Sequence, residues 1–524
     1  MSLLTLIILL PLATAGLILA VPRNFRFGIR MLALASSALT MLLSLLLAAR
    51  FDQAPEVDGF RFVQEWAWLP SLGIQFKLGV DGLNLGLIVM GAIVAFAAVC
   101  AAWEIRSERD KEFYVLLQVM AAGVLGAFAS IDLFFFYFFH ELALVPTFIM
   151  IGVWGSGPDK NYAAFKITLY LTAGALIALV GLILLYVQSG AKTFDWVALA
   201  KAVQAKPIPS GEQSTIFGLL LFGFGILVSL WPFHTWAPLG YGAAPTPAAM
   251  LHAGVLKKFG LYGLIRVGLP LLPEGAREWM PVLAILCLGN ILHCGWVAMR
   301  QKDLGQLIGH SSVAHVGFIF LGIASLSIAG VAGAVMVMVA HGLLAALSFS
   351  LHGYFRHHVG STDMTQLGGL LARMPLIGTL LIMAMMAGCG VPGFANFAGE
   401  ALVLFGAWKT MPWFVVAAAW GALIIGAVYM LRGIRSILHG PVPAGFTSAS
   451  DASLWRGFPM ILLVACLLLL GCWPRLLLDR VRPGVERAVR IAGFQPQPGE
   501  SRGRPGIGVR LPSLPGTEPR LAAQ

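Results

Sequence analysis

The sequence of 524 residues is 58% hydrophobic and only 11% charged, with a mean hydropathy of +0.84 and a net charge of +11. A soluble protein of this length needs a far more charged surface, so the composition excludes that class and indicates a polytopic membrane protein. In such a protein the positive charge bears on orientation and lipid contact, and it does not indicate nucleic-acid binding.

The chain opens on MSLLTLIILLPLATAGLILA, which lacks a basic n-region and precedes further apolar runs, so we interpret it as the first span rather than a signal peptide. Counting runs of about 20 apolar residues predicts an all-α membrane protein with about 14 transmembrane helices. The predicted spans are 2–20, 31–49, 79–103, 113–130, 131–154, 163–187, 214–238, 247–270, 279–299, 306–328, 330–354, 375–406, 412–438 and 457–474. Asp132, at the start of the fifth span, is expected at the membrane interface.

Basic residues follow the odd-numbered spans, which predicts that those loops are cytoplasmic and that the N-terminus is periplasmic. They are Arg23, Arg26, Arg30, Arg106, Arg109, Lys111, Lys160, Arg300 and Lys302. An even number of spans places the C-terminus outside as well, where the arginines of the tail depart from the rule. That tail, 479–524, is rich in Pro, Gly and Arg and is predicted to be disordered.

Two spans contain helix-breaking residues at membrane depth. The seventh carries Pro232 and Pro238 in LWPFHTWAP, and the twelfth carries Gly390 and Pro392 in AGCGVPGFANFAGE. Non-helical backbone in a membrane is tolerated where it is buried in protein or lines a wet cavity, and paired broken helices indicate an ion path. The alternative is two ordinary proline kinks.

Ionisable residues lie within the apolar spans, where each charge at the bilayer centre costs roughly 2.5–3.5 kcal/mol. They are Glu141, Lys166, Lys257, Lys258, Glu400, His140, His234, His310, His315 and His341. Groups that exchange protons at such positions indicate a proton relay, whereas the alternative is a structural Glu–Lys pair between helices. We interpret His293 and His352 as structural histidines.

The two adjacent lysines are predicted to diverge. Neighbours on a helix point about 100° apart, so one of Lys257 and Lys258 lines the path and the other meets a neighbouring helix. His315 and His341 lie in successive spans, and imidazole both donates and accepts hydrogen bonds, so these rings can bridge a lysine and a glutamate through water. The six cysteines stand singly in apolar runs without a CxxC pair, so neither zinc nor an iron–sulfur cluster is indicated.

Six stretches of the chain carry a family resemblance. They are DLFFFYFFHELALVPTFIMIGVWG, PFHTWAP, APTPAAMLHAGVLKKFGLYGLIR, HSSVAHVGFIFLGI, MVAHGLLAALSFSLHGYFR and GVPGFANFAGEALVLFGAW. Together they resemble subunit M of bacterial complex I, the proton-pumping NADH:quinone oxidoreductase. Its mitochondrial counterpart is NADH dehydrogenase subunit 4. The likeness runs from about Gly79 to Leu438, and Glu400 favours subunit M over the sister subunits L and N, which resemble it but end their path in a lysine.

The resemblance implies an architecture with two inverted five-helix repeats and broken helices 7 and 12. The expected parts are N-terminal helices in 1–112, a first repeat in 113–238, a second in 239–406, C-terminal helices in 407–478 and the tail. It also implies a proton relay through Glu141, Lys258, His315, His341 and Glu400, with Lys257, His140 and His234 as auxiliary groups.

The resemblance further implies a non-redox, proton-translocating subunit that is not catalytic by itself. No cofactor or metal is expected in this chain, because NADH, FMN, iron–sulfur clusters and quinone belong to the parent complex. The implied partners are L-like and N-like membrane-arm subunits and the lipid bilayer, in the bacterial inner membrane.

One departure from the family pattern concerns Glu141. The family places a lysine five residues before the proline of its P-h-H-x-W motif, where this chain has Leu227, and the acidic and histidine residues after the motif are replaced by LGY. Glu141 has therefore lost its expected partner, and His140, through a water, or Lys257 are the possible substitutes. Two alternatives stay open: a subunit of a multi-subunit cation/proton antiporter or membrane-bound hydrogenase, and a scaffold subunit without pumping.

Overall fold

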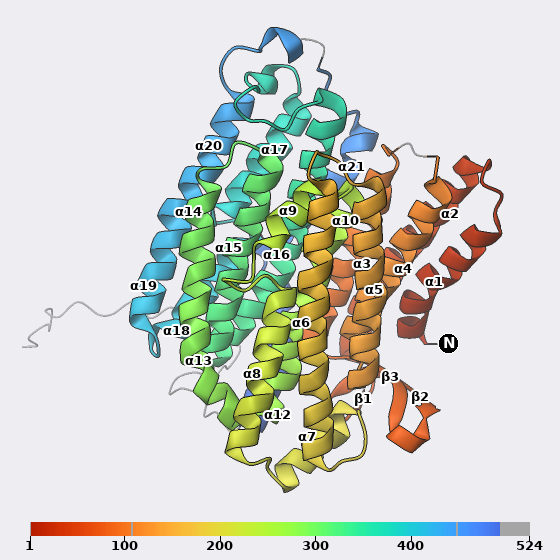
Figure 1. The fold of residues 1–524 in the computed structure, drawn as a ribbon, viewed down its shortest axis with the longest axis vertical. Coiled ribbons are helices and arrows are strands. Elements are labelled where there is room, and N and C mark those ends of the chain that lie inside the picture. Colours follow the sequence, from red (N-terminus) through yellow and green to blue (C-terminus); the bar gives the residue numbers. More distant parts are fainter. Residues whose placement is uncertain (1, 106–107, 447–448, 493–524) are drawn as a thin grey trace, which may run out of the picture.

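Long helices run side by side through most of the molecule, and a small sheet lies at one end of them (Figure 1). The structure is a computed structural model that describes residues 2–105, 108–446 and 449–492. Within those ranges, 12 helical segments are long and apolar enough to cross a membrane. The prediction of a helical polytopic membrane protein is therefore confirmed.

The first helices are α1 (Leu3–Ala20), α2 (Arg26–Arg50), α3 (Gly82–Ala102), α4 (Asp110–Ala129), α5 (Leu133–Trp154), α6 (Lys160–Ser189), α7 (Trp196–Ala205) and α8 (Ser210–Leu227). A segmented central stretch follows: α9 (Trp236–Ala243), α10 (Thr246–Leu251), the π-helix η3 (His252–Leu256), α11 (Lys258–Gly263), the π-helix η4 (Leu264–Gly268) and α12 (Leu269–Leu271).

The second half contains α13 (Pro273–Leu288), η5 (Gly289–Cys294), α14 (Gly295–Ala298), α15 (Leu304–Ala324), α16 (Ile328–Tyr354), η6 (Phe355–Val359), α17 (Pro375–Gly388), α18 (Ala395–Trp408), α19 (Pro412–Trp420), η8 (Gly421–Gly426), α20 (Ala427–Leu438), α21 (Leu454–Cys472) and α22 (Arg475–Ile491). Short 3₁₀ turns are η1 (Phe51–Gln53), η2 (Pro70–Leu72), η7 (Leu370–Ala372) and η9 (Ala444–Phe446).

Twelve of the predicted spans correspond to long helical segments, and the other two are assembled from shorter pieces. The predicted span 247–270 consists of α10, η3, α11 and η4, and the predicted span 375–406 consists of α17 and α18. The inverted relationship of the two repeats and the boundaries of the expected parts stay predictions.

Both predicted breaks are present. The chain leaves the helix at 228–235, between α8 and α9, and again at 389–394, between α17 and α18. At the first break Asn290 accepts a hydrogen bond from the Trp231 backbone N–H at 2.8 Å and donates to the carbonyls of Ser229 and Val313 at 2.9 and 3.1 Å. The backbone N–H and carbonyl groups that the break leaves without helical partners therefore bond to a side chain inside the protein. An ordinary proline kink would not need such a side chain.

A three-stranded antiparallel sheet in 56–80 was not anticipated from the sequence. Its strands are β1 (Glu56–Val57), β2 (Phe60–Leu69) and β3 (Ile74–Val80), in the order β1-β2-β3. Lys77 fixes β3 to the start of α7 through a 3.0 Å contact between its Nζ and a carboxylate oxygen of Asp195. The sheet therefore extends the helical bundle at one end, beyond the span of α3 (Figure 1).

Asp132 lies at this same end of the bundle, and its position at a membrane interface stays a prediction. Its carboxylate caps α5 by accepting hydrogen bonds from the backbone N–H groups of Phe134 and Phe135 at 2.9 and 3.2 Å, and from Gln75 on β3 at 3.0 Å. Burial raises the pKa of Asp132 to about 6, and these three donors act in the opposite direction.

The prediction of disorder from residue 479 is wrong for 479–491, which form most of α22. Apolar residues four apart, Leu477, Val481, Val485 and Val489, are buried against the bundle, while Arg487 pairs with Glu56 at 2.8 Å. The tail as a whole is rich in Pro, Gly and Arg, so its composition predicted disorder although its first residues have the apolar spacing of a helix. Residues 493–524 and Arg106 lie outside the described residues.

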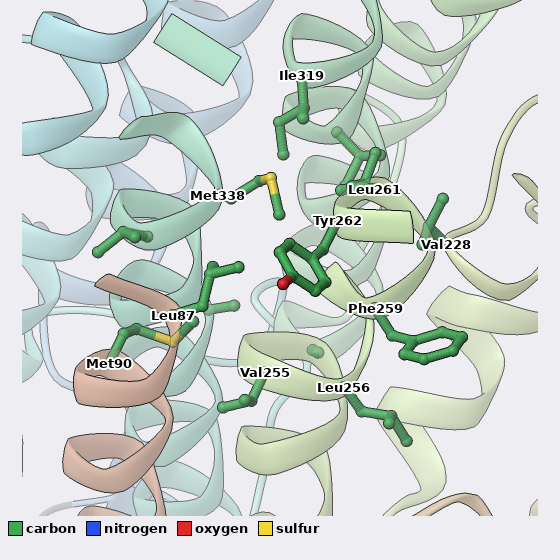
Figure 2. Packing of buried hydrophobic residues seen from close by; sticks show 14 of the residues in the cluster. Leu87, Met90, Val228, Val255, Leu256, Phe259, Leu261, Tyr262, Ile319 and Met338 are labelled. Carbon is green, nitrogen blue, oxygen red and sulfur yellow. The ribbon is translucent and has the colours of Figure 1, made fainter. Parts of the chain in front are cut away.

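The centre of the bundle is closely packed around the segmented stretch. Apolar side chains from α3, η3, α11, α15 and α16 meet there, including Leu87, Val255, Leu261, Ile319 and Met338 (Figure 2). A polar group on any of these helices is therefore shielded from bulk solvent and depends on a neighbouring polar group for its hydrogen bonds.

Candidate functional site

Lys258 occupies the centre of the packed region, completely buried at the start of α11. Its Nζ donates a hydrogen bond to the carbonyl of Ala253 at 2.7 Å and lies 2.8 Å from Nδ1 of His341 on α16. A π-helix shifts the backbone pairing by one residue, and the carbonyl of Ala253 within η3 accepts the lysine's hydrogen bond. The interruption in the helix thus helps to hold the amine in an otherwise apolar interior.

Lys257 points elsewhere, which confirms that the two lysines diverge. Its Nζ lies 3.4 Å from the Ser312 hydroxyl on α15 and 5.7 Å from the centre of the Tyr241 ring. Both lysines are buried, and it is the amine of Lys258 that lies within hydrogen-bond distance of the His341 ring. The proposed substitute role of Lys257 as the direct partner of Glu141 is wrong, because its amine contacts α15 instead.

His341 and His315 continue the line of polar groups, with ring centres 5.7 Å apart. Nδ1 of His315 lies 2.7 Å from the carbonyl of Ser311, and Nε2 lies 3.0 Å from the carbonyl of Gly388, the last residue of α17. Since both ring nitrogens face acceptors, this imidazole can hold a second proton without leaving a donor unpaired. The break after α17 supplies one of those acceptors.

Glu400 ends the line on α18, beyond the second break. Its Oε1 lies 3.8 Å from Nε2 of His315 and has no hydrogen-bond partner among the described residues. Gly390 has a φ of +67°, and a Cβ there would lie 3.0 Å from Oε2 of Glu400, so glycine lets the broken segment approach the carboxylate. Asn396, one turn earlier on α18, is fully buried, and neither of its amide atoms has a partner in the described part of the chain.

A cavity of about 10 Å³ lies beside this carboxylate, lined by His315, Gly388, Glu400 and Tyr429 among others. That volume is close to the minimum that a single water molecule requires. A water there would have polar partners from α15, α17 and α18. The structure therefore brings Lys258, His341, His315 and Glu400 together as the sequence predicted.

Glu141 is only partly enclosed by this chain. Its side chain is 34% exposed, in contrast to the buried side chains of Lys258 and Glu400. It also contacts His140 directly, with Oε1 3.3 Å from Nδ1, although the two positions diverge on the helix. The flexible glutamate side chain spans that divergence without an intervening water.

His140 itself is buried and stacks on Phe259 of α11 at a ring distance of 4.0 Å. The same phenylalanine stacks on Phe136 at 4.1 Å, so part of the aromatic run joins α5 to the segment that carries Lys258. Phe134 and Phe138 from that run face outward instead. The aromatic run is thus divided between the core and the outer surface.

His252 is a candidate that sequence reasoning missed. It is buried at the start of η3, packs on Trp236 and Tyr241 at ring distances of 5.6 and 5.4 Å, and interacts electrostatically with His140, Lys257 and Lys258. Its Nδ1 has no hydrogen-bond partner in the described ranges. His252 stands six positions before Lys258, and six positions do not place two residues on one face of a helix, so helical spacing did not connect the two in the sequence.

His234 lies in the first break and belongs to a second group of histidines. Its ring centre is 5.8 Å from that of His293, and His310 and Lys257 are electrostatic neighbours. Nδ1 of His310 lies 2.9 Å from the Gln306 carbonyl.

His293 is exposed rather than the buried structural residue that we expected. Lys166, another sequence candidate, lies 5.7 Å from the ring centre of Tyr162 on α6.

Buried amines, imidazoles and a carboxylate in one line, beside two broken spans, are typical of polytopic membrane proteins that translocate protons or cations. The family model described as NADH:quinone oxidoreductase/Mrp antiporter, transmembrane, matches residues 130–426. NADH-quinone oxidoreductase subunit M from Rhodobacter capsulatus is 33% identical over 503 residues, which cover 93% of this chain and 96% of that protein. The chain therefore belongs to the NADH-quinone oxidoreductase subunit M family.

Solved structures agree with this assignment. A chain of respiratory complex I from Thermus thermophilus with bound NADH is 27% identical, with a TM-score of 0.85 over 94% of this chain and all of that one. A chain of the Mrp complex from Dietzia sp. DQ12-45-1b has a TM-score of 0.81 at 19% identity, covering 94% and 99% of the two chains. The second likeness shows the shared fold alone.

Proposed function

We propose that this chain is the proton-translocating M subunit of a bacterial respiratory complex I, in which it couples NADH:quinone electron transfer to proton movement. The observation that carries the proposal is the buried line from Lys258 through His341 and His315 to Glu400. Charged groups are costly at this depth, so four of them in one line favour transport over a scaffold role.

In this mechanism the Lys258 ammonium is the central proton store. When His341 accepts its proton at Nδ1, the neutral amine keeps the hydrogen bond and the imidazole carries the charge. Transfer from His341 to His315 crosses 5.7 Å between ring centres, and transfer to Glu400 crosses 3.8 Å, so both steps need a bridging water or a small side-chain movement. Glu400 then releases the proton from the second broken helix.

Coupling requires an element with two arrangements, and the breaks at 228–235 and 389–394 are our candidates. The second break supplies the Gly388 carbonyl that holds Nε2 of His315. Movement of that carbonyl would change which acceptor the imidazole faces and would direct its proton toward Glu400 or back toward His341.

The partly exposed Glu141 is proposed to face an L-like or N-like membrane-arm subunit, which would complete the site left without a lysine at Leu227. His140 and His252 would then connect this outer carboxylate to Lys258. We further propose that the N-terminus is periplasmic in the bacterial inner membrane. The chain is proposed to hold no redox cofactor and to be inactive by itself, with NADH, FMN, iron–sulfur clusters and quinone bound elsewhere in the complex.

Purification of the chain from native membranes in mild detergent tests this proposal. We expect it to be isolated with flavin, with iron–sulfur absorbance and with NADH:quinone activity. Isolation with only small hydrophobic subunits and no NADH oxidation would overturn it, and would favour the alternative of a multi-subunit cation/proton antiporter or membrane-bound hydrogenase.

A further inference from the structure

A cavity of about 530 Å³ opens at the end of the bundle where α2 begins and α3 ends, away from the relay. Its walls come mainly from α2 and α3, which are consecutive helices early in the chain, and from α16 and α21, which lie much later in the sequence. It is far larger than the cavity beside Glu400, and the relay residues do not line it. Its shape and chemistry therefore need a separate explanation.

One wall of the cavity is apolar. Leu34 and Ala38 line it from α2, Phe96 lines it from α3, and Phe458 and Met460 line it from α21. From Arg30 to Ala38 the wall extends along α2 by about 12 Å, at ~1.5 Å per residue. A hydrocarbon chain of several methylene groups fits along such a wall.

The outer rim of the cavity is polar and mainly basic. Arg30, Arg456, His357 and His358 line it, against the single lining carboxylate of Glu104. Glu104 is already engaged, with its two oxygens each 3.1 Å from a nitrogen, one of Arg456 and one of His358. The basic groups therefore retain donor capacity that no lining carboxylate uses.

Two buried polar atoms along the cavity lack partners in the described part of the chain. They are Nε of Arg30, whose NH2 group pairs with Asp110 at 2.7 Å, and the hydroxyl oxygen of Ser350, a residue only 2% exposed. A buried donor without an acceptor is costly, so both atoms point to a polar ligand. Trp455 stands at the rim and is 78% exposed, as interfacial tryptophans are.

We propose that this cavity binds one anionic phospholipid. Its phosphate lies at the rim among Arg30, Arg456 and His357, and part of an acyl chain lies along Leu34 and Phe96. A free phosphate would satisfy the rim but would leave the apolar wall empty. A zwitterionic lipid offers the same phosphate, but its headgroup cation would lie beside Arg30 and Arg456, which disfavours it relative to an anionic lipid. The lipid joins the N-terminal helices α2 and α3 to the C-terminal helix α21. This inference does not depend on the proposed function.

Native mass spectrometry of the intact complex tests the proposal, after delipidation and titration with phosphatidylglycerol or phosphatidylcholine. We expect one phosphatidylglycerol to be retained per chain, with phosphatidylcholine bound about tenfold more weakly. Arg456→Gln should weaken retention about tenfold, and Ala38→Trp should prevent it by filling the cavity. Arg373→Gln, an exposed residue outside the cavity, is the matched control and should bind as the wild type does.

Equal retention by the wild type and both cavity variants would show annular lipid only and would overturn the proposal. Displacement of the lipid by millimolar inorganic phosphate alone would also overturn it, because the acyl chain would then add nothing. If Ala38→Trp prevents assembly, the comparison of Arg456→Gln with Arg373→Gln still decides the question.

Discussion

Nζ of Lys258 lies 2.8 Å from Nδ1 of His341, so a buried amine on a segmented helix is joined directly to an imidazole on α16. Both side chains are at most 1% exposed. The two nitrogens are close enough to exchange a proton, and the surrounding apolar core isolates them from solvent.

Replacement of Lys258 by methionine keeps the volume of the side chain and removes its proton. We expect proton pumping to fall roughly tenfold or more, because a proton-transfer group is lost from the centre of the line. The measurement is NADH-driven acidification of inverted vesicles, normalised to the content of assembled complex. Lys257→Met is the matched control, since its amine lies 3.4 Å from the Ser312 hydroxyl and over the Tyr241 ring rather than within hydrogen-bond distance of His341. Equal losses in the two variants would contradict a special role for Lys258.

Glu400→Gln retains the shape of the side chain but not its ability to carry a proton. Because Oε1 of Glu400 has no hydrogen-bond partner in the described residues, assembly and thermal stability should change little while pumping falls severalfold. Vesicle acidification and a thermal melt of the same preparation separate the two effects. Glu274→Gln, at an exposed ion pair with Arg277, should leave both unchanged. Pumping at the wild-type level in Glu400→Gln would remove this carboxylate from the path.

His252→Leu tests the group that connects the outer histidine to the lysines. If protons pass from His140 through His252 to Lys258, the substitution should slow pumping severalfold and alter its solvent deuterium isotope effect. His352→Leu serves as the control, because that histidine is equally buried but is not among the electrostatic neighbours of either lysine. An unchanged rate and isotope effect in His252→Leu would leave His252 with a packing role alone.

The sequence was most informative where composition and local chemistry decide the structure. Long apolar runs predicted the spans, and Pro232 and Gly390 marked the two breaks, because proline lacks a backbone donor and glycine adopts positive φ. Glu400 and the two relay histidines were found because such residues are rare in apolar spans. These signals are local, and no knowledge of the tertiary arrangement was needed to recognise them.

Exposure and helical phase could not be predicted in the same way. The sequence around Glu141 is apolar on both sides, but whether that apolar surface meets the core or the outside depends on which helices pack beside α5. His252 was missed because it stands six positions before Lys258, a spacing that does not place two residues on one helical face. The helix α22 was missed because its apolar spacing is short and lies in a polar tail.

Asn290→Ala tests whether the first break is held by one side chain. The substitution leaves the Trp231 N–H and the carbonyls of Ser229 and Val313 without their partner, at a cost of about 1–3 kcal/mol for each group left unsatisfied. We expect a clearly lower melting temperature for the purified complex. Asn290→Asp keeps the acceptor for Trp231 and loses the two donors. A melting temperature unchanged in Asn290→Ala would show that the break is held by other contacts.

Asp132 provides a prediction of pH dependence outside the membrane. Burial raises its pKa to about 6 in the folded protein, above the ordinary 3.8, so the protonated form is favoured by folding. Its contribution to stability is therefore fully present below pH 4 and is lost as the pH rises through 6, by on the order of 2–3 kcal/mol. Melting curves from pH 4 to 8 should show the wild type gaining stability relative to Asp132→Asn as the pH falls. A constant difference between the two proteins across this range would contradict the prediction.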